Sequence, residues 1–326
     1  AAVARALGSL PANAQTAIKL TLDWVFQGPT SPFLVALEKG YYKAEGLDVT
    51  MDPGQGSAGA VQRVATGAYQ IGFADVNSTI EYNAKNPGKE VLCVCMVYDF
   101  APFGVYALKK SGIKTPKDLE GKKLGAPVFD ASFRLFPAFA KKNGITKWEH
   151  VNLTPQLREQ SLVQGTVDFI SGHYFSSMLD LKARGVAFED IVAMRFVDFG
   201  MDVYGNGVVV SAEMAKNEKA VKGFLAATMK GWKDVIANPQ LGIAAAKKRD
   251  PLIDEKLEME RLKISLETNI LTPYVKANGM GDVDPTRFAR AVKDVSEAFG
   301  LPIVPAPDKV FSNAYQPPKA DRMVAK

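Results

Sequence analysis

Cysteine and histidine are scarce in this sequence, which has two of each among its 326 residues. These four side chains are few for the ligand clusters that metalloenzymes use, so we expect no metal site. No run of about 18 apolar residues is present, and the sequence therefore predicts no membrane-spanning helix. Lysine and arginine number 40 against 35 aspartate and glutamate residues, without basic runs, which argues against nucleic acid as a partner.

The composition, with 47% apolar and 23% charged residues, is that of an ordinary globular protein. Since a chain of this length exceeds the size at which single cores stop growing, we expect two lobes. Cys93 and Cys95 lie in the apolar run 91–97, which predicts a strand. Because side chains alternate along a strand, we expect both sulfurs on one face, as buried free thiols.

Residues 1–17 are rich in alanine, and Ala12-Asn13-Ala14 fits the A-x-A pattern that precedes a signal-peptidase cut. We interpret residues 1–16 as a leader remnant or as a flexible N-terminus, which alanine-rich chain ends often form. A leader would carry the protein out of the cytoplasm.

Alternating apolar residues and turn signals predict a strand–helix–strand order that occurs twice along the chain. The predicted strands are 18–24, 47–51, 69–74, 123–126, 149–153 and 167–171. The predicted helices are 31–46, 57–67, one from about 131, one around 159, and three in the last third at 221–236, 254–272 and 286–299. This order implies parallel sheets flanked by helices, followed by a proline-rich tail that we expect to be extended.

The segment 31–49, SPFLVALEKGYYKAEGLDV, resembles the opening P-F-x-x-A-x-x-x-G-Y-F-x-x-x-G-L-x-V of a family of solute-binding proteins. This is the nitrate/taurine/alkanesulfonate and thiamine-pyrimidine-precursor-binding family of ABC importers. Further matches follow in the family's order at residues 62–74, 113–125 and 162–169. The resemblance covers residues 17–240 at consistent spacing.

The resemblance implies an α/β protein of the type II periplasmic-binding-protein fold, with two parallel or mixed sheets, flanking helices and a cleft between two lobes. Lobe 1 would comprise residues 17–103 and 206–326, and lobe 2 residues 104–205, with chain crossings near 103–106 and 204–207. It also implies a periplasmic or lipid-anchored extracytoplasmic monomer that captures a small molecule in the cleft. A membrane permease and an ATPase would be its partners, with no nucleic acid, no cofactor and no enzymatic activity.

In open α/β sheets, ligands bind beyond the carboxyl ends of the strands. The residues at the predicted ends are aromatic or rich in hydrogen-bond acceptors, and Arg134 is the nearest cation. From lobe 1 and its second crossing they are Asp23, Trp24, Ser57, Asp75, Asn77, Tyr98, Asp99 and Asn206. From lobe 2 they are Phe129, Ser132, His173 and Tyr174.

Asp23-Trp24 and the segment 171–176 resemble ligand-binding stretches of family members that bind pyrimidine precursors of thiamine. The Pro-Asn and His that follow Asp-Trp in those proteins are missing here, and Ser176 and Ser177 stand where a glutamate is expected. The resemblance implies a small heteroaromatic, pyrimidine-like ligand.

A planar, amino-bearing ring would stack on Trp24 and Tyr174, and its N–H groups would donate to Asp23 or Asp99. Alternatively, a sulfonate or nitrate would be bound by free N–H groups at helix N-termini near Ser57 and Ser132. Asp23, Asp75 and Ser132 can also act only as caps of the turn or helix that follows them. A third alternative is a pyrimidine-synthesising enzyme of the same fold, but the cysteine cluster of such enzymes is missing from this sequence.

Overall fold

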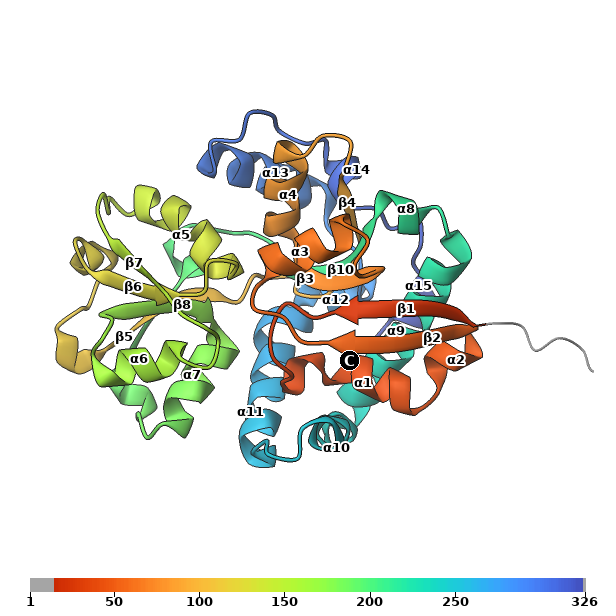
Figure 1. Cartoon of the computed structure of the whole chain (residues 1–326), viewed down its shortest axis with the longest axis horizontal. Coiled ribbons are helices and arrows are strands. Elements are labelled where there is room, and N and C mark those ends of the chain that lie inside the picture. Colours follow the sequence, from red (N-terminus) through yellow and green to blue (C-terminus); the bar gives the residue numbers. More distant parts are fainter. Residues whose placement is uncertain (1–14, 325–326) are drawn as a thin grey trace, which may run out of the picture.

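The computed structural model describes residues 15–324, and its strands form two five-stranded sheets (Figure 1). The interpretation of Ala12-Asn13-Ala14 as part of a leader concerns residues outside this range. No helix between residues 15 and 324 is long and apolar enough to cross a membrane. The same residues contain no group of three or more His, Cys, Asp or Glu side chains arranged to hold a metal ion.

The first sheet has the strand order β2-β1-β3-β10-β4. Its strands are β1 (Thr16–Thr21), β2 (Leu47–Asp52), β3 (Ile71–Asp75), β4 (Val91–Met96) and β10 (Asn206–Ser211). β2, β1 and β3 are parallel, as the strand–helix–strand order predicts, whereas β10 runs antiparallel to both β3 and β4. The sheet is therefore mixed, and β10, from the middle of the chain, lies inside it.

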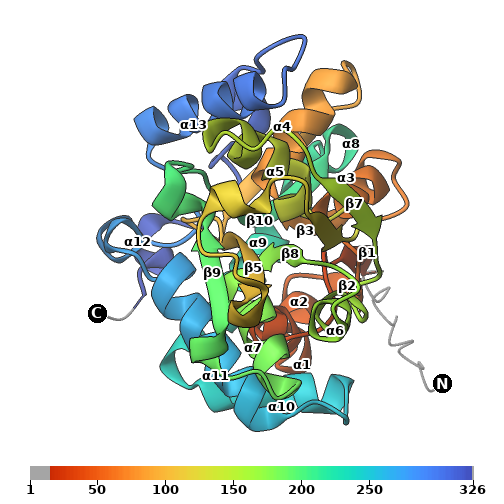
Figure 2. The ribbon, with the colours of Figure 1, turned by 90° about the vertical axis from the view of Figure 1, so that its left-hand side faces the viewer.

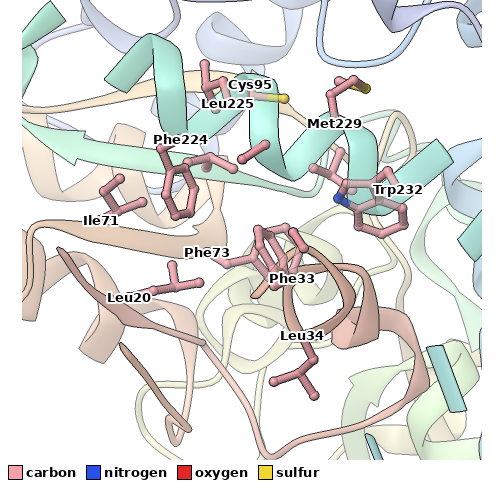
Figure 3. Packing of buried hydrophobic residues seen from close by; sticks show 14 of the residues in the cluster. Leu20, Phe33, Leu34, Ile71, Phe73, Cys95, Phe224, Leu225, Met229 and Trp232 are labelled. Atoms are coloured by element: carbon pink, nitrogen blue, oxygen red, sulfur yellow. The ribbon is translucent and has the colours of Figure 1, made fainter. Parts of the chain in front are cut away.

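Helices cover both faces of the first sheet, and we call the sheet with these helices the first lobe. One face packs against α1 (Ser31–Glu38), α2 (Tyr41–Ala44), α9 (Glu218–Ala237) and α10 (Pro239–Arg249). The other packs against α3 (Ser57–Ala65), α4 (Val76–Lys85), α13 (Pro285–Ala298) and α14 (Pro307–Val310). In the first of these cores, Phe33 contacts Phe73 and Trp232 edge to face, with ring centroids 5.1 and 6.3 Å apart (Figure 3).

The second sheet has the order β7-β6-β8-β5-β9 and, with its helices, forms the second lobe (Figure 2). Its strands are β5 (Phe103–Leu108), β6 (Lys123–Ala126), β7 (Glu149–Asn152), β8 (Phe169–His173) and β9 (Ile191–Arg195). Its helices are α5 (Ala131–Lys142) on one face and α6 (Arg158–Gln164) and α7 (Tyr174–Ala183) on the other. β5 is antiparallel to its neighbours β8 and β9, so this sheet is mixed as well. The predicted α/β architecture with two sheets and flanking helices is confirmed.

The chain passes between the two sheets twice, at residues 97–102 and 196–205. The sequence placed these crossings near 103–106 and 204–207, but Gly104 and Gly207 lie inside β5 and β10, where ladder pairing holds their backbone. The strand membership of the sheets supports a division close to the one expected, and we propose lobe boundaries within these two connecting segments.

Other local predictions differ from the structure for identifiable reasons. The strand predicted over 18–24 ends at Thr21, so Trp24 belongs to a bend rather than to the strand face. The helix predicted over 31–46 is interrupted at Gly40, whose φ of 71° breaks it into α1 and α2. The tail is not wholly extended, since it contains α14 and the short helix α15 (Lys319–Arg322).

The two cysteines are buried and free, as expected, but they do not share a face. Register between β4 and β10 shifts at Val208/Val209, which pair with Cys95 and Cys93. This bulge adds a residue to β4 and reverses the alternation of side chains beyond it. Cys93 consequently packs into the core under α3 and α4, and Cys95 into the core under α1 and α9.

Candidate functional site

A small pocket lies where the carboxyl ends of the strands of both lobes meet. Its lining residues come from five loops and helix starts and are Asp23, Trp24, Gly56, Ser57, Asp130, Ala131, Arg158, His173 and Ser176. The space open to a water-sized sphere is about 10 Å³, which is the room that one water molecule needs. The lobes are thus closed on each other, and a ring-sized ligand requires them to separate before it can enter.

Glycine at position 56 allows this closure. Gly56 has φ 145°, a value that other residues rarely adopt, and it precedes the N-terminus of α3. A Cβ atom at this position would lie 2.1 Å from the carbonyl oxygen of Phe129 in the second lobe. The N–H of Ala58 donates to that same carbonyl at 3.1 Å, so the backbones of the two lobes touch beside the pocket.

Asp23 is the acidic residue that the first lobe contributes. Its side chain is buried, and its Oδ2 accepts hydrogen bonds from Asn206 Nδ2 at 2.7 Å and from Ser57 Oγ at 3.0 Å. Burial raises the pKa of Asp23 from 3.8 to about 6, against the lowering effect of these two donors. Both donors bind Oδ2, and no side chain within residues 15–324 donates to Asp23 Oδ1. This second oxygen is therefore available to a ligand that carries N–H groups.

Arg158 and Trp24 form the contact across the pocket. The guanidinium of Arg158, from the start of α6, lies 4.6 Å from the centroid of the Trp24 ring. Its Nη1 is 3.4 Å from Asp130 Oδ2, and its Nε donates to Glu159 Oε1 at 2.8 Å. Ser177 Oγ also donates to Glu159, at 3.0 Å. The one cation of the pocket lining is therefore buried between two carboxylates that offset its charge.

His173 closes the pocket from the second lobe. It is the last residue of β8, and its ring packs against Tyr98, Phe103 and Phe175 with centroids 5.5 to 6.3 Å apart. Burial among these aromatic rings lowers the pKa of His173 to about 4. The imidazole is therefore neutral at physiological pH, and one of its nitrogens can donate while the other accepts.

Several predicted site residues are thus brought together. Asp23, Trp24, Ser57 and His173 line the pocket, Asn206 binds Asp23 directly, and Tyr98 packs against His173.

Asp75 and Asn77 lie behind the pocket. Asp75 is the N-cap of α4, where it accepts from the N–H of Ser78 at 2.9 Å, and burial raises its pKa to about 7. Asn77 Nδ2 donates to Asp75 Oδ1 and to the carbonyl of Tyr204. The N–H of Asp75 donates to Ser57 Oγ, so this cluster supports the pocket through Ser57.

Four further predicted residues lie outside the pocket lining. Asp99 accepts from Thr272 Oγ1 at 2.5 Å and pairs with Arg287 at 3.0 Å. The Tyr174 ring packs under the guanidinium of Arg195 instead, at 5.5 Å. Phe129 is 39% exposed and faces Gly59. Ser132 is buried and hydrogen-bonds Asp130, the N-cap of α5.

Sequence reasoning missed Arg158; it did not select Asp130 from the stretch 129–132, and it noted Ser176 only as standing where a glutamate is expected. It took Arg134 as the nearest cation, but Arg134 pairs with Glu81 of α4 and does not line the pocket. The rule of strand ends, applied also to the loop after β7, would have led to Arg158, which begins the next helix. Asp130 stands directly before a predicted helix, a position typical of an N-cap.

Two curated relatives are similar over most of the chain. The riboflavin-binding protein RibY of Chloroflexus aurantiacus is 27% identical over 321 residues, which cover 94% of this chain and 88% of that protein. The formylaminopyrimidine-binding protein of Halalkalibacterium halodurans is 27% identical over 260 residues, or 77% of each chain.

Among solved structures, the alkanesulfonate-binding protein SsuA of Xanthomonas axonopodis pv. citri, bound to MOPS, superposes with a TM-score of 0.69 at 14% identity. The superposition covers 91% of this chain and 98% of SsuA, which confirms the predicted periplasmic-binding-protein fold. The family model described as "NMT1/THI5 like" matches residues 28–241, more than half of the chain, and the protein belongs to this family.

Proposed function

We propose that this protein is the extracytoplasmic substrate-binding component of an ABC importer and captures a small pyrimidine-like heteroaromatic solute between its lobes. The observation that carries the proposal is the pairing of an aromatic face, Trp24, with the carboxylates of Asp23 and Asp130 in one pocket. A planar ring with amino or ring N–H groups satisfies both features, since it stacks on the indole and donates to the carboxylates. The names of the two curated relatives, which bind a pyrimidine and a flavin, support a ring-shaped ligand.

The charge of the pocket disfavours the oxoanion alternative. A sulfonate or nitrate needs a net surplus of donors or positive charge, whereas Arg158 is already offset by Asp130 and Glu159. Asp23 adds a further carboxylate on the opposite wall. The likeness to SsuA extends to the fold at 14% identity, so it gives no reason to carry the sulfonate over.

The size of the pocket favours one ring over three. The side chains of the closed protein leave room for about one water molecule, so every ring that binds must hold the lobes further apart. A single pyrimidine ring requires a smaller displacement than a tricyclic flavin does. Binding would then proceed by opening and reclosure about the two connecting segments, 97–102 and 196–205.

Calorimetric titration with an aminopyrimidine, riboflavin and an alkanesulfonate tests the proposal. We expect the aminopyrimidine to bind most tightly, and Trp24→Ala to weaken it more than the matched aromatic variant Tyr174→Ala, whose ring lies outside the pocket lining. Tighter binding of the sulfonate than of both rings would refute the proposed ligand class. Turnover of the bound pyrimidine into a new product would refute the carrier role and restore the enzyme alternative.

A further inference from the structure

One helix of the C-terminal part, α11 (Glu255–Ser265), lies at the junction of the two lobes (Figure 1). On one side it packs against α7 of the second lobe, and on the other against α10 and the short helical turn Gly28–Thr30 of the first. Two of its side chains, Glu258 and Arg261, face inward and are buried. The function proposed above does not use either of them.

Arg261 binds the first turns of α7. Its Nη1 donates to the carbonyl oxygens of Phe175 and Ser176, both at 3.0 Å, and its Nη2 donates to Asp180 Oδ1 at 2.7 Å. The side chain is only 1% exposed. Three acceptors from one helix of the other lobe thus converge on a single guanidinium, a geometry that its planar fork matches and that an ammonium cannot reproduce.

Glu258 binds the opposite wall. Its Oε2 accepts from the N–H of Gly28 at 2.6 Å, and both of its oxygens accept from Arg261 Nε at 3.1 and 3.2 Å. The approach is close, because a Cβ atom on Gly28 would lie 2.5 Å from the carbonyl oxygen of Glu258. A glycine is therefore needed where the loop after Trp24 meets α11.

The two backbone segments held in this way adjoin the pocket, one from each lobe. Gly28 begins the short helical turn that follows the bend at Trp24, and Ser176 lines the pocket from the second lobe. The segments also touch directly, since Ser176 Oγ donates to Gln27 Oε1 at 2.6 Å. One buried ion pair on α11 is hence hydrogen-bonded to a segment on each side of the pocket.

We propose that Glu258 and Arg261 form a latch between the lobes: they are positioning residues that hold the closed arrangement and thereby set how long a ligand stays bound. The latch does not touch the ligand. Its effect on the ligand-free protein is independent of the proposed function, whereas its effect on residence time rests on that function. Because a ligand enters and leaves through the open form, losing the latch speeds dissociation and, by opening the ligand-free protein, speeds association as well.

A neighbouring ion pair provides the matched control. Lys182 of α7 and Glu260 of α11 also join the lobes, at 2.6 Å, but their side chains are 46% and 36% exposed. Solvent screens such a pair, so that it contributes little to holding the lobes together. Glu260→Gln removes a charge from the same helix and the same interface without touching the buried pair.

The first arm of the test needs no ligand. Small-angle X-ray scattering should show a larger radius of gyration for Arg261→Met than for the wild type, an intermediate value for Arg261→Lys, and no change for Glu260→Gln. If Arg261→Met does not fold, the radius of gyration of Arg261→Lys tests the latch in its place. An unchanged radius in the arginine variants, or an equal increase in Glu260→Gln, overturns the latch.

The second arm follows the release of an aminopyrimidine by stopped-flow tryptophan fluorescence. We expect koff to rise about tenfold in Arg261→Met, and kon to rise as well, because more of the ligand-free variant is open. A lower melting temperature with unchanged koff would show a purely structural role and overturn the proposal. If the wild type binds no ring compound, the proposed function fails, and the scattering arm still decides the latch.

Discussion

Replacing Asp23 by asparagine should stabilise the ligand-free protein at neutral pH, although the residue lies in the pocket. The carboxylate is buried at 5% exposure, and its two donors, Ser57 and Asn206, are uncharged. An asparagine oxygen can accept the same two hydrogen bonds at the same place. The substitution therefore removes a buried charge and keeps the contacts that hold the side chain.

The magnitude follows from the pKa of Asp23, which burial raises from 3.8 to about 6. A native pKa above the unfolded value stabilises the fold in full below the unfolded pKa, and this contribution is lost as pH rises through the native pKa. At about 1.36 kcal/mol per pKa unit, the wild type loses on the order of 3 kcal/mol between about pH 3.5 and pH 7. Asparagine does not titrate, so the variant keeps this stability at neutral pH.

Urea unfolding of both proteins across pH measures this difference. The free energy of unfolding of Asp23→Asn should match the wild type at about pH 3.5 and exceed it by about 2–3 kcal/mol at about pH 7.5. The exposed carboxylate Asp198, whose side chain is 60% exposed, serves as control, and Asp198→Asn should leave stability within about 0.5 kcal/mol at both values. A variant no more stable than the wild type at neutral pH would refute the reasoning.

The remaining predictions concern the ligand and the charged cluster. Asp23→Asn should weaken binding of an aminopyrimidine by about 1.5–3 kcal/mol in calorimetry, whereas tighter binding would point to an oxoanion. Binding of the aminopyrimidine to the wild type should weaken as pH falls below about 6, because protonation converts the Asp23 carboxylate to a neutral acid. His173 stays neutral down to its pKa of about 4 and does not contribute to this change. Calorimetric titration at several pH values checks this. Trp24→Ala should cost about 2–3 kcal/mol of affinity. Arg158→Met leaves two buried carboxylates without their cation and should cost about 3–5 kcal/mol of stability in urea unfolding.

The periodicity of apolar residues in the sequence predicts most of the helices and strands. Of the predicted strands, 123–126 is identical to β6 and 47–51 differs from β2 by one residue, because apolar alternation there is bounded by turn residues on both sides. The antiparallel insertion of β10 into the first sheet could not be read in this way, since strand pairing across 110 residues or more leaves no local pattern. The β4 bulge is likewise invisible in the run 91–97, because it depends on register with β10.

The site was harder to predict from the sequence. The ends of the strands identify candidate residues, but they do not show which of these residues already hydrogen-bond or form ion pairs with other parts of the protein. Asp23 and Asp99 both follow a strand, but Asp99 meets Arg287 from a helix nearly 190 residues later. Asp99 therefore lies outside the pocket lining and is not available to a ligand there. Arg158 presents the converse case, because its burial beside Trp24 depends on the closed arrangement of the two lobes, which no single segment encodes.

The charges around the pocket distinguish a ring with N–H groups from an oxoanion more clearly than the shape of the pocket does. Helix N-termini point at the pocket from α3 and α5, a geometry that on its own would favour an anion. Asp130, however, caps α5 by accepting the N–H of Phe133, so that this helix also presents a carboxylate to the pocket. With Asp23 and Glu159, it outnumbers the guanidinium of Arg158 by three to one. An oxoanion would be repelled by this field, whereas each ring N–H group finds an acceptor in it.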